Sequence, residues 1–136
     1  MKFTMRIDPP TTTAQQHRFG GFAANGRAIL YDSPKLREAK HTLAGALIPN
    51  APAEPFKGAI ALTVRWFFKT TDKKKQGRWK ISRPDTDNLQ KLFKDEMTKA
   101  GFWKDDAQVC AEYVEKYWSE QGHIDVTITE LPTAKE

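Results

Sequence analysis

The chain has 136 residues and a formal charge of +5, from 22 Lys and Arg against 17 Asp and Glu, which is the size of one ordinary domain. A chain of this length can form a core without disulfides or a structural metal, and a single cysteine, Cys110, excludes an intramolecular disulfide and a cysteine-rich zinc site. The composition, 39% hydrophobic and 29% charged, excludes a disordered chain, and no apolar run is long enough to span a membrane. The alternating residues 1–6 also lack the apolar stretch of a secretory signal. We therefore expect a single domain over residues 1–136 that works in the reducing cytoplasm, away from membranes.

Two strand patterns are expected in the first third of the chain. Residues 2–8 alternate, with Phe3, Met5 and Ile7 on one face, and two prolines follow. Residues 17–19 and 28–31 flank an Asn25-Gly26 pair, which predicts a short hairpin whose turn takes its positive φ angles from that pair.

A helix and a long strand follow. Ser33 and Pro34 are typical of a helix start, and Pro49 of its end. Between them, apolar residues recur at helical spacing: Leu36, Ala39, Leu43 and Leu47. Residues 59–69 then alternate as the strongest strand pattern in the chain.

The last third predicts a second helix and two strands. A polar loop over residues 71–84 leads into a helix that begins at Asp87 and closes at Gly101. Residues 109–118 and 124–129 are typical of strands. The fold class predicted from these elements is α+β, with a mixed sheet packed against about two main helices.

The charge is divided unevenly along the chain. Residues 65–104 carry +7, whereas residues 105–136 carry −6. Within the polar loop, basic residues surround Gly77 and Trp79, a composition suited to a phosphate backbone. An ordinary solvated surface explains the same composition, so both interpretations stay open.

The acids are placed unusually. Asp85 and Asp87 stand at the mouth of the second helix, directly after the basic loop, and Asp105 and Asp106 follow the same helix. A capping box formed by Asp87 and Gln90 would account for part of this pattern, and Asp87 with Lys91 one turn later would form an ordinary ion pair. Clustered carboxylates are otherwise tolerated mainly around a hard cation such as Mg²⁺ or Mn²⁺, which suits metal-dependent phosphodiester hydrolysis.

Three motifs carry a resemblance to a known family. The segments RPDTDNLQK (83–91), TKAGFW (98–103) and DDAQV (105–109) occur in this order and spacing, and together they resemble the RusA family of Holliday-junction resolvases. Agreement is looser through the last strand, residues 125–130, and the first 80 residues agree only in length and element order. The resemblance implies a homodimeric, Mg²⁺-dependent endonuclease, with Mn²⁺ as a substitute, that makes paired symmetric nicks in four-way DNA during recombination and repair.

The resemblance also implies roles for individual residues. Asp85, Asp87 and Asp106 would be catalytic metal ligands, and Lys91 would be the important lysine of the family. Asp105 and Asn88 would support these ligands without binding the metal, Asp105 because adjacent residues of an extended segment point to opposite faces. The residues expected to bind DNA are Lys73, Lys74, Lys75, Arg78, Lys80, Arg83 and Lys94.

Some alternatives remain open at this point. Glu96 falls on the apolar side of the second helix, where it would either face a basic group across a dimer interface or be partly exposed. Phe102 and Trp103 would belong to the core rather than stack on bases. A binding protein without catalysis is the main rival function, although a protein that only binds DNA gains nothing from three aspartates that repel phosphate. A nucleotide-sugar transferase with a DxD motif is excluded by the small size.

Overall fold

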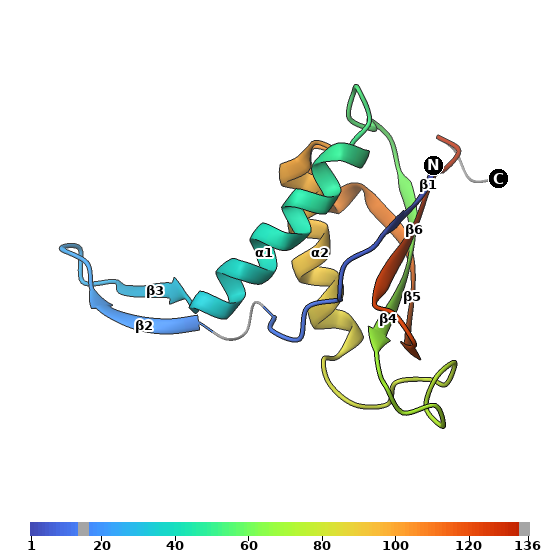
Figure 1. Cartoon of the computed structure of the whole chain (residues 1–136). Coiled ribbons are helices and arrows are strands. Elements are labelled where there is room, and N and C mark those ends of the chain that lie inside the picture. The colour runs from blue at the N-terminus through green and yellow to red at the C-terminus, as the bar shows by residue number, and fades with distance from the viewer. Residues whose placement is uncertain (14–16, 134–136) are drawn as a thin grey trace.

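A computed structural model describes residues 1–13 and 17–133. Its body is a four-stranded sheet in the order β1–β6–β4–β5, built from β1 (Lys2–Met5), β6 (His123–Glu130), β4 (Ile60–Lys69) and β5 (Val109–Ser119). β4 runs parallel to β5 and antiparallel to β6, which is antiparallel to β1. Two helices, α1 (Pro34–Leu47) and α2 (Thr86–Ala100), lie on the same side of this sheet (Figure 1). The α+β prediction, with a mixed sheet and two main helices, is confirmed.

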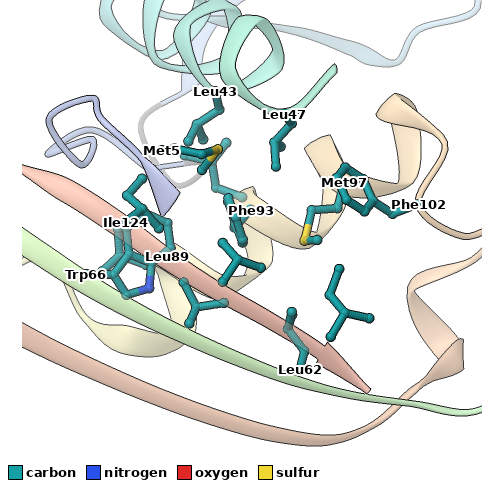
Figure 2. Packing of buried hydrophobic residues seen from close by; sticks show 14 of the residues in the cluster. Met5, Leu43, Leu47, Leu62, Trp66, Leu89, Phe93, Met97, Phe102 and Ile124 are labelled. Atoms are coloured by element: carbon teal, nitrogen blue, oxygen red, sulfur yellow. The ribbon is translucent and has the colours of Figure 1, made fainter. Parts of the chain in front are cut away.

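The core forms between the sheet and the helices. Along β4 the buried residues alternate with less buried ones, as predicted for the longest strand pattern. Figure 2 shows Trp66 and Leu62 of β4 directed toward Leu89 and Phe93 of α2 and the α1 leucines. The core residues that line up on β4, β6 and the two helices are Ile60, Leu62, Val64, Trp66, Phe68, Ile124, Val126, Ile128, Leu36, Leu43, Leu47, Leu89, Leu92, Phe93 and Met97.

The first strand is shorter than its sequence pattern. β1 ends at Met5, which pairs with Ile124, whereas alternation predicts a strand through residue 8. The difference arises because β6 begins at His123, so almost no partner strand remains beyond Met5. Ile7 still packs against the core without belonging to the strand.

The predicted hairpin is present. β2 (His17–Phe22) pairs antiparallel with β3 (Ala28–Asp32), and the pair projects from the start of α1, away from the sheet (Figure 1). Only Gly26 in the turn has a positive φ, 81°, so the prediction of two such residues is wrong. The Asn25 side chain instead accepts a hydrogen bond from the Arg27 N–H at 3.0 Å, so Asn25 supports the turn without itself adopting the left-handed conformation.

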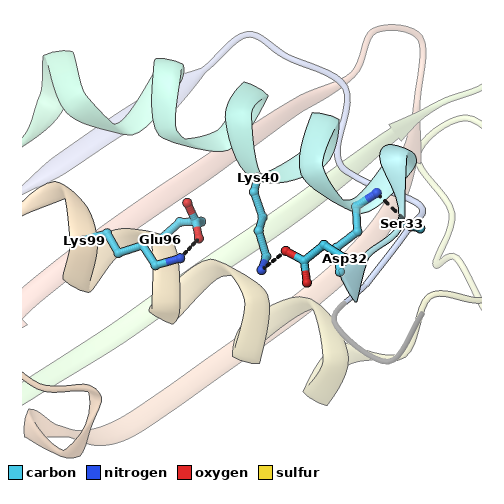
Figure 3. A network of polar contacts seen from close by, with 6 residues as sticks. Asp32, Ser33, Lys40, Glu96 and Lys99 are labelled. Atoms are coloured by element: carbon cyan, nitrogen blue, oxygen red, sulfur yellow. Dashed lines mark hydrogen bonds and ion pairs between the residues drawn. The ribbon is translucent and has the colours of Figure 1, made fainter. Parts of the chain in front are cut away.

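The start of α1 is capped as predicted. The Ser33 hydroxyl accepts a hydrogen bond from the Leu36 N–H at 3.1 Å, and proline occupies the first turn. The Lys40 ammonium lies 2.6 Å from the Asp32 carboxylate, so an ion pair ties the end of β3 to α1 (Figure 3). α1 ends at Leu47 and passes into a short 3₁₀ helix, Ile48–Asn50, that contains the predicted terminating proline.

α2 ends at Gly101, whose φ of 93° is the left-handed conformation that the prediction required. Phe102 and Trp103 are buried, as expected of core residues. Glu96 is only 4% exposed, and its carboxylate lies 3.2 Å from the Lys99 ammonium of the same helix (Figure 3). Partial exposure of Glu96 is therefore wrong, and its basic partner lies in its own chain. None of the helices in the described residues has the length and apolar character needed to cross a bilayer.

Candidate functional site

Two carboxylates are presented at the first turn of α2. Asp85 is the N-cap residue, with extended backbone, but its side chain makes no capping hydrogen bond; Asp87 lies in the first turn and is exposed. The capping box expected of Asp87 and Gln90 is wrong, because the helix begins one residue earlier. Gln90 is directed at the sheet, where it accepts a hydrogen bond from Trp66 Nε1 at 2.9 Å and donates one to Glu112 at 2.7 Å. Both carboxylates are thus released from capping, next to the positive end of the helix dipole.

Two lysines fix the backbone that leads into this turn. Lys80 Nζ donates to the Ser82 hydroxyl at 2.7 Å and to the Arg83 carbonyl at 2.6 Å. Lys116 Nζ donates to the carbonyls of Ser82 and Pro84, both at 2.8 Å. Backbone carbonyls held by cations from β5 and from the loop itself keep the residue after Pro84, the first carboxylate, in a defined place.

Lys80 is therefore placed differently from what its position in the basic loop predicts. It is 7% exposed, and its ammonium lies 4.4 Å from the centre of the Trp118 ring and 5.0 Å from that of Phe68. Burial lowers the pKa of Lys80, and the positive charges of Lys116 and Lys75 lower it further. A cation enclosed in this way is not available to a phosphate, so we remove Lys80 from the expected DNA-binding residues and assign it to the structure of the loop.

The rest of the basic loop faces solvent. Asp72 organises its tip, since the Asp72 carboxylate accepts the Lys74 N–H and the Asp72 carbonyl accepts the Lys75 N–H, both at 3.0 Å. Five basic residues of this loop are exposed: Lys73, Lys74, Lys75, Arg78 and Arg83. From here on, the term basic loop means these five residues, without Lys80. Lys94, the remaining residue expected to bind DNA, lies on α2 and pairs with Glu112 at 3.1 Å, which neutralises part of its charge.

Lys91 lies one turn beyond Asp87 on the exposed side of α2. Its ammonium contributes to the electrostatic surroundings of Asp95, a further turn along the helix. Asn88 is half-buried in the first turn. The exposed face of α2 therefore runs from an acid through a lysine to a second acid.

Asp106 lies at the other end of α2, in a short 3₁₀ helix, Asp106–Gln108. Its carboxylate accepts a hydrogen bond from the Thr98 hydroxyl, which itself accepts one from Trp103 Nε1 at 2.8 Å, and it shares a further hydrogen bond with Asp95. Burial acts to raise the pKa of Asp106, but the hydrogen bond from Thr98 and the further polar contributions of Asp95 and Trp103 outweigh burial and hold this pKa below its ordinary value. The pKa of Asp95 is raised, by burial first and then by the bond and the charge of Asp106.

Asp105 caps the turn that carries Asp106. Its carboxylate accepts the Ala107 N–H at 2.8 Å, and the Gln108 side chain accepts the Asp105 N–H at 3.3 Å in a reciprocal capping box. The Gln108 amide also donates to the Phe56 carbonyl at 2.9 Å, which ties the turn to the chain before β4. The expected straight extended segment through Asp105 and Asp106 is wrong beyond Asp105, because the chain turns there.

The expected metal ligands are not brought together within one chain. Asp87 and Thr98, the hydrogen-bond partner of Asp106, are eleven residues apart on one continuous helix, so about 16 Å separates their positions along its axis at the rise of an α-helix. Mg²⁺ holds its ligands at about 2.1 Å, which no shared ion could satisfy over such a span. Among the described residues, no three or more His, Cys, Asp and Glu side chains are grouped closely enough to hold a metal ion.

Sequence reasoning missed Asp95. The residue is half-buried, hydrogen-bonded to Asp106 and within the field of Lys91 and Lys99. Its signal was present in the spacing, because Asp87, Lys91 and Asp95 follow one another at four-residue intervals on one helical face. Spacing alone does not distinguish such a row from a solvated surface, and the contact with Asp106 depends on the turn after α2.

Comparison with known proteins places these motifs in a family. A family model described as endodeoxyribonuclease RusA matches residues 9–129. The chain is 33% identical over 132 residues to a crossover junction endodeoxyribonuclease of Lactococcus phage r1t, an alignment that covers 96% of this chain and 98% of the relative. It is 52% identical over 50 residues to the enzymes of that name from Escherichia coli K12 and Enterobacteria phage 82, covering 36% of this chain and 42% of each relative. The chain therefore belongs to the RusA endodeoxyribonuclease family.

Proposed function

We propose that this protein is a crossover junction endodeoxyribonuclease, which hydrolyses phosphodiester bonds in four-way DNA by paired symmetric nicks, during recombination and repair in the cytoplasm of a bacterium or a phage-infected host. One observation carries the proposal: two exposed carboxylates, Asp85 and Asp87, stand free of capping at the mouth of α2, directly after the exposed basic loop. A protein that only held DNA would gain no affinity from acids beside its cations. The relative from Lactococcus phage r1t, which aligns with this chain over 98% of its own length, is named a crossover junction endodeoxyribonuclease.

A divalent cation fits the start of α2. Asp85 and Asp87 offer only carboxylate oxygens, the ligands that Mg²⁺ prefers, and neither side chain is used to cap the helix. We propose that these two residues bind Mg²⁺, with Mn²⁺ as a substitute. Such an ion, when bound, supplies Lewis-acid polarisation of the scissile phosphate and lowers the pKa of water.

The third expected ligand, Asp106, requires a second copy of the chain. Within one subunit, Asp106 is held by Thr98, which lies about 16 Å along α2 from Asp87. A two-fold homodimer in which the two α2 helices lie antiparallel beside each other across the axis would place the far end of each α2 beside the near end of the other. We propose that each site combines Asp85 and Asp87 of one subunit with Asp106 of its partner, and that the two equivalent sites produce the two symmetric nicks.

The basic loop, Lys91 and Asp105 have separate roles in this proposal. The basic loop would neutralise phosphates beside the cleaved bond, because its exposed side chains belong to the segment that leads into Asp85, with Arg83 two residues before it. Lys91 lies one turn from Asp87 and would stabilise the negative charge that develops on the phosphate in the transition state. Asp105 holds the turn that carries Asp106 through its capping bond.

Incubation of the protein with a synthetic four-way junction and a linear duplex of the same sequence, with Mg²⁺ or with EDTA, tests the proposal. We expect symmetric nicks in the junction alone, and only with Mg²⁺. Equal cleavage of both DNAs would indicate a general nuclease. Tight junction binding without cleavage under any metal would favour a protein that binds DNA without catalysis.

A further inference from the structure

One face of the sheet is left open. The buried side chains of β4 point to α1 and α2, so those between them, among them Thr63, Arg65 and Phe67, belong to the opposite face. No helix within residues 1–13 and 17–133 lies over that face (Figure 1). Its side chains are therefore reachable by a partner.

Four rings cross this face in a single row: Trp79, Tyr117, Phe67 and His123. Their planes are nearly parallel, with ring centres 4.5 Å apart for Trp79 and Tyr117, 5.1 Å for Tyr117 and Phe67, and 4.1 Å for Phe67 and His123. The interplanar angles are 21°, 15° and 9°. Each ring is the direct cross-strand partner of the next, so the register of the sheet sets the row. We call these four side chains the ring row.

The outer end of the ring row is open to solvent. Trp79 is 60% exposed, although its backbone segment is held against β5 by hydrogen bonds from the Trp118 N–H to the Arg78 carbonyl at 2.9 Å and from the Lys80 N–H to the Lys116 carbonyl at 3.0 Å. A large indole on a fixed backbone thus offers uncovered ring surface at the edge of the sheet.

A cation adjoins the exposed end of the ring row. Arg78 directly precedes Trp79 in the basic loop. Glu115, an acid beside the row, is neutralised, since it accepts hydrogen bonds from the Tyr117 hydroxyl and from Arg65 Nε, both at 2.5 Å. The hydrogen bond between the Tyr117 hydroxyl and Glu115 also fixes the orientation of the Tyr117 ring. A cation beside an exposed aromatic ring on an open sheet is the combination with which proteins hold unpaired nucleotides, the ring stacking on a base and the cation contacting a phosphate.

We propose that an unpaired DNA base stacks on the open face of Trp79, the exposed end of the ring row, while the basic loop holds the phosphates of the same strand. The inference rests on the proposed function for its biological setting, the bases unstacked where a four-way junction is opened. It adds a contact that neither phosphate binding nor the carboxylates provide. A stacked base is read through its ring face, so this surface discriminates single strands from duplexes rather than one sequence from another.

Binding measured in EDTA tests this proposal apart from cleavage. The probes are a fluorescein-labelled 20-nucleotide oligothymidylate and a labelled 20-base-pair duplex, followed by anisotropy. We expect Trp79→Ala to weaken oligothymidylate binding about 5- to 100-fold, with little change for the duplex and an unchanged salt dependence. Trp79→Phe should keep most of the affinity. Ile81→Ala is the matched control, because Ile81 is apolar and 96% exposed but lies outside the row.

Three results would overturn the proposal: an unchanged affinity of Trp79→Ala for the single strand, an equal loss for single strand and duplex, or a loss matched by Ile81→Ala. Sedimentation of wild type and Trp79→Ala supplies a further check. Conversion of a dimer to a monomer by the substitution would assign the row to self-association instead. Selective loss of single-strand binding in a protein that fails to cut junctions would support the ring row and refute the nuclease, so the two proposals fail separately.

Discussion

The two ends of α2 present aspartates in contrasting surroundings. At the first turn, Asp85 and Asp87 face solvent, and the chain that leads to them is fixed through backbone carbonyls by Lys80 and Lys116. At the far end, Asp106 is half-buried and its carboxylate is itself held by Thr98. Asp85 and Asp87 are thus positioned through the backbone, and their carboxylate oxygens accept no capping hydrogen bond. Asp106 is positioned through a hydrogen bond to its carboxylate.

This difference bears on what each end can do. Carboxylate oxygens that accept no capping bond have lone pairs to offer a cation, so the first turn suits a resident metal. The oxygens of Asp106 already accept bonds from its neighbours, and the low pKa that results keeps this acid ionised. Asp106 is thus suited to supply a fixed negative charge to a site whose other ligands, Asp85 and Asp87, come from the partner subunit.

The largest expected effect comes from breaking the first turn. Asp87→Asn should reduce junction cleavage at least about 100-fold, since loss of a group that only supports a metal ligand already costs about 10- to 100-fold. Junction binding should stay equal or become tighter, because a negative charge next to phosphate is removed. Nicking and gel-shift assays measure both, with Glu130→Gln, an exposed acid at the end of β6, as control. Loss of binding together with activity would make Asp87 a structural residue.

Mixing two inactive variants tests whether the two ends meet across a dimer. Asp87→Asn and Asp106→Asn proteins, unfolded and refolded together, should recover about a quarter of the wild-type sites, since half of the random dimers are mixed and one of their two sites is intact. Refolding each variant alone is the control. Continued inactivity of the mixture, with mixed dimers shown to be present, would place all three acids in one subunit.

The basic loop should produce a smaller effect than loss of an aspartate that binds the metal. Replacement of Lys73, Lys74 and Lys75 by Ala is expected to weaken junction binding by about tenfold or more and to reduce the slope of log affinity against log salt by about 2 to 3, because fewer counterions are released. Titrations at several salt concentrations give the slope. The matched control is Lys104→Ala, a single exposed lysine beyond α2. An unchanged slope would return the loop to an ordinary solvated surface.

The smallest effect concerns the far end alone. An acid whose pKa is lower in the folded than in the unfolded protein stabilises the fold when the pH is above the ordinary pKa of that acid. This contribution to the free energy of unfolding disappears as the pH falls through the folded-state pKa. Thr98→Val removes the hydroxyl that lowers the pKa of Asp106, so the variant should be less stable than wild type near pH 7 and the difference should shrink below pH 3.8, the ordinary value. Urea unfolding across this range measures it. Thr98→Ser, which keeps the hydroxyl, should behave as wild type, and a difference independent of pH would refute this role.

Much of the fold followed from local patterns. The alternation in β4 predicted its buried face, and Ser33 with Pro34 predicted the start of α1, because these signals depend on residues a few positions apart. β1 was predicted too long, since its end depends on where β6 begins. The Asp87 capping box failed because α2 takes Asp85 as its N-cap residue, and Gln90 is hydrogen-bonded to Trp66 and Glu112, on strands distant in the sequence.

The site divides along the same line. Sequence motifs identified Asp85, Asp87, Lys91 and Asp106 as a set, but chemical type and order do not fix separation in space. Lys80 illustrates the limit: within its loop it resembles its neighbouring lysines, yet the pairing of its segment with β5 turns it inward onto Trp118.

By itself, the sequence determined the elements, the faces they bury and the family motifs, because periodicity and short-range spacing act within single elements. Only the tertiary structure decided that the three aspartates lie at opposite ends of one helix, and that four rings from different segments form one row. The first depends on the length of α2 and on the turn after it, and the second on the register of the sheet, which links residues far apart in the chain. The acids and cations predicted from the sequence lie on α2, on the loop before it and on the turn after it. The ring row on the open face of the sheet could not be predicted from composition.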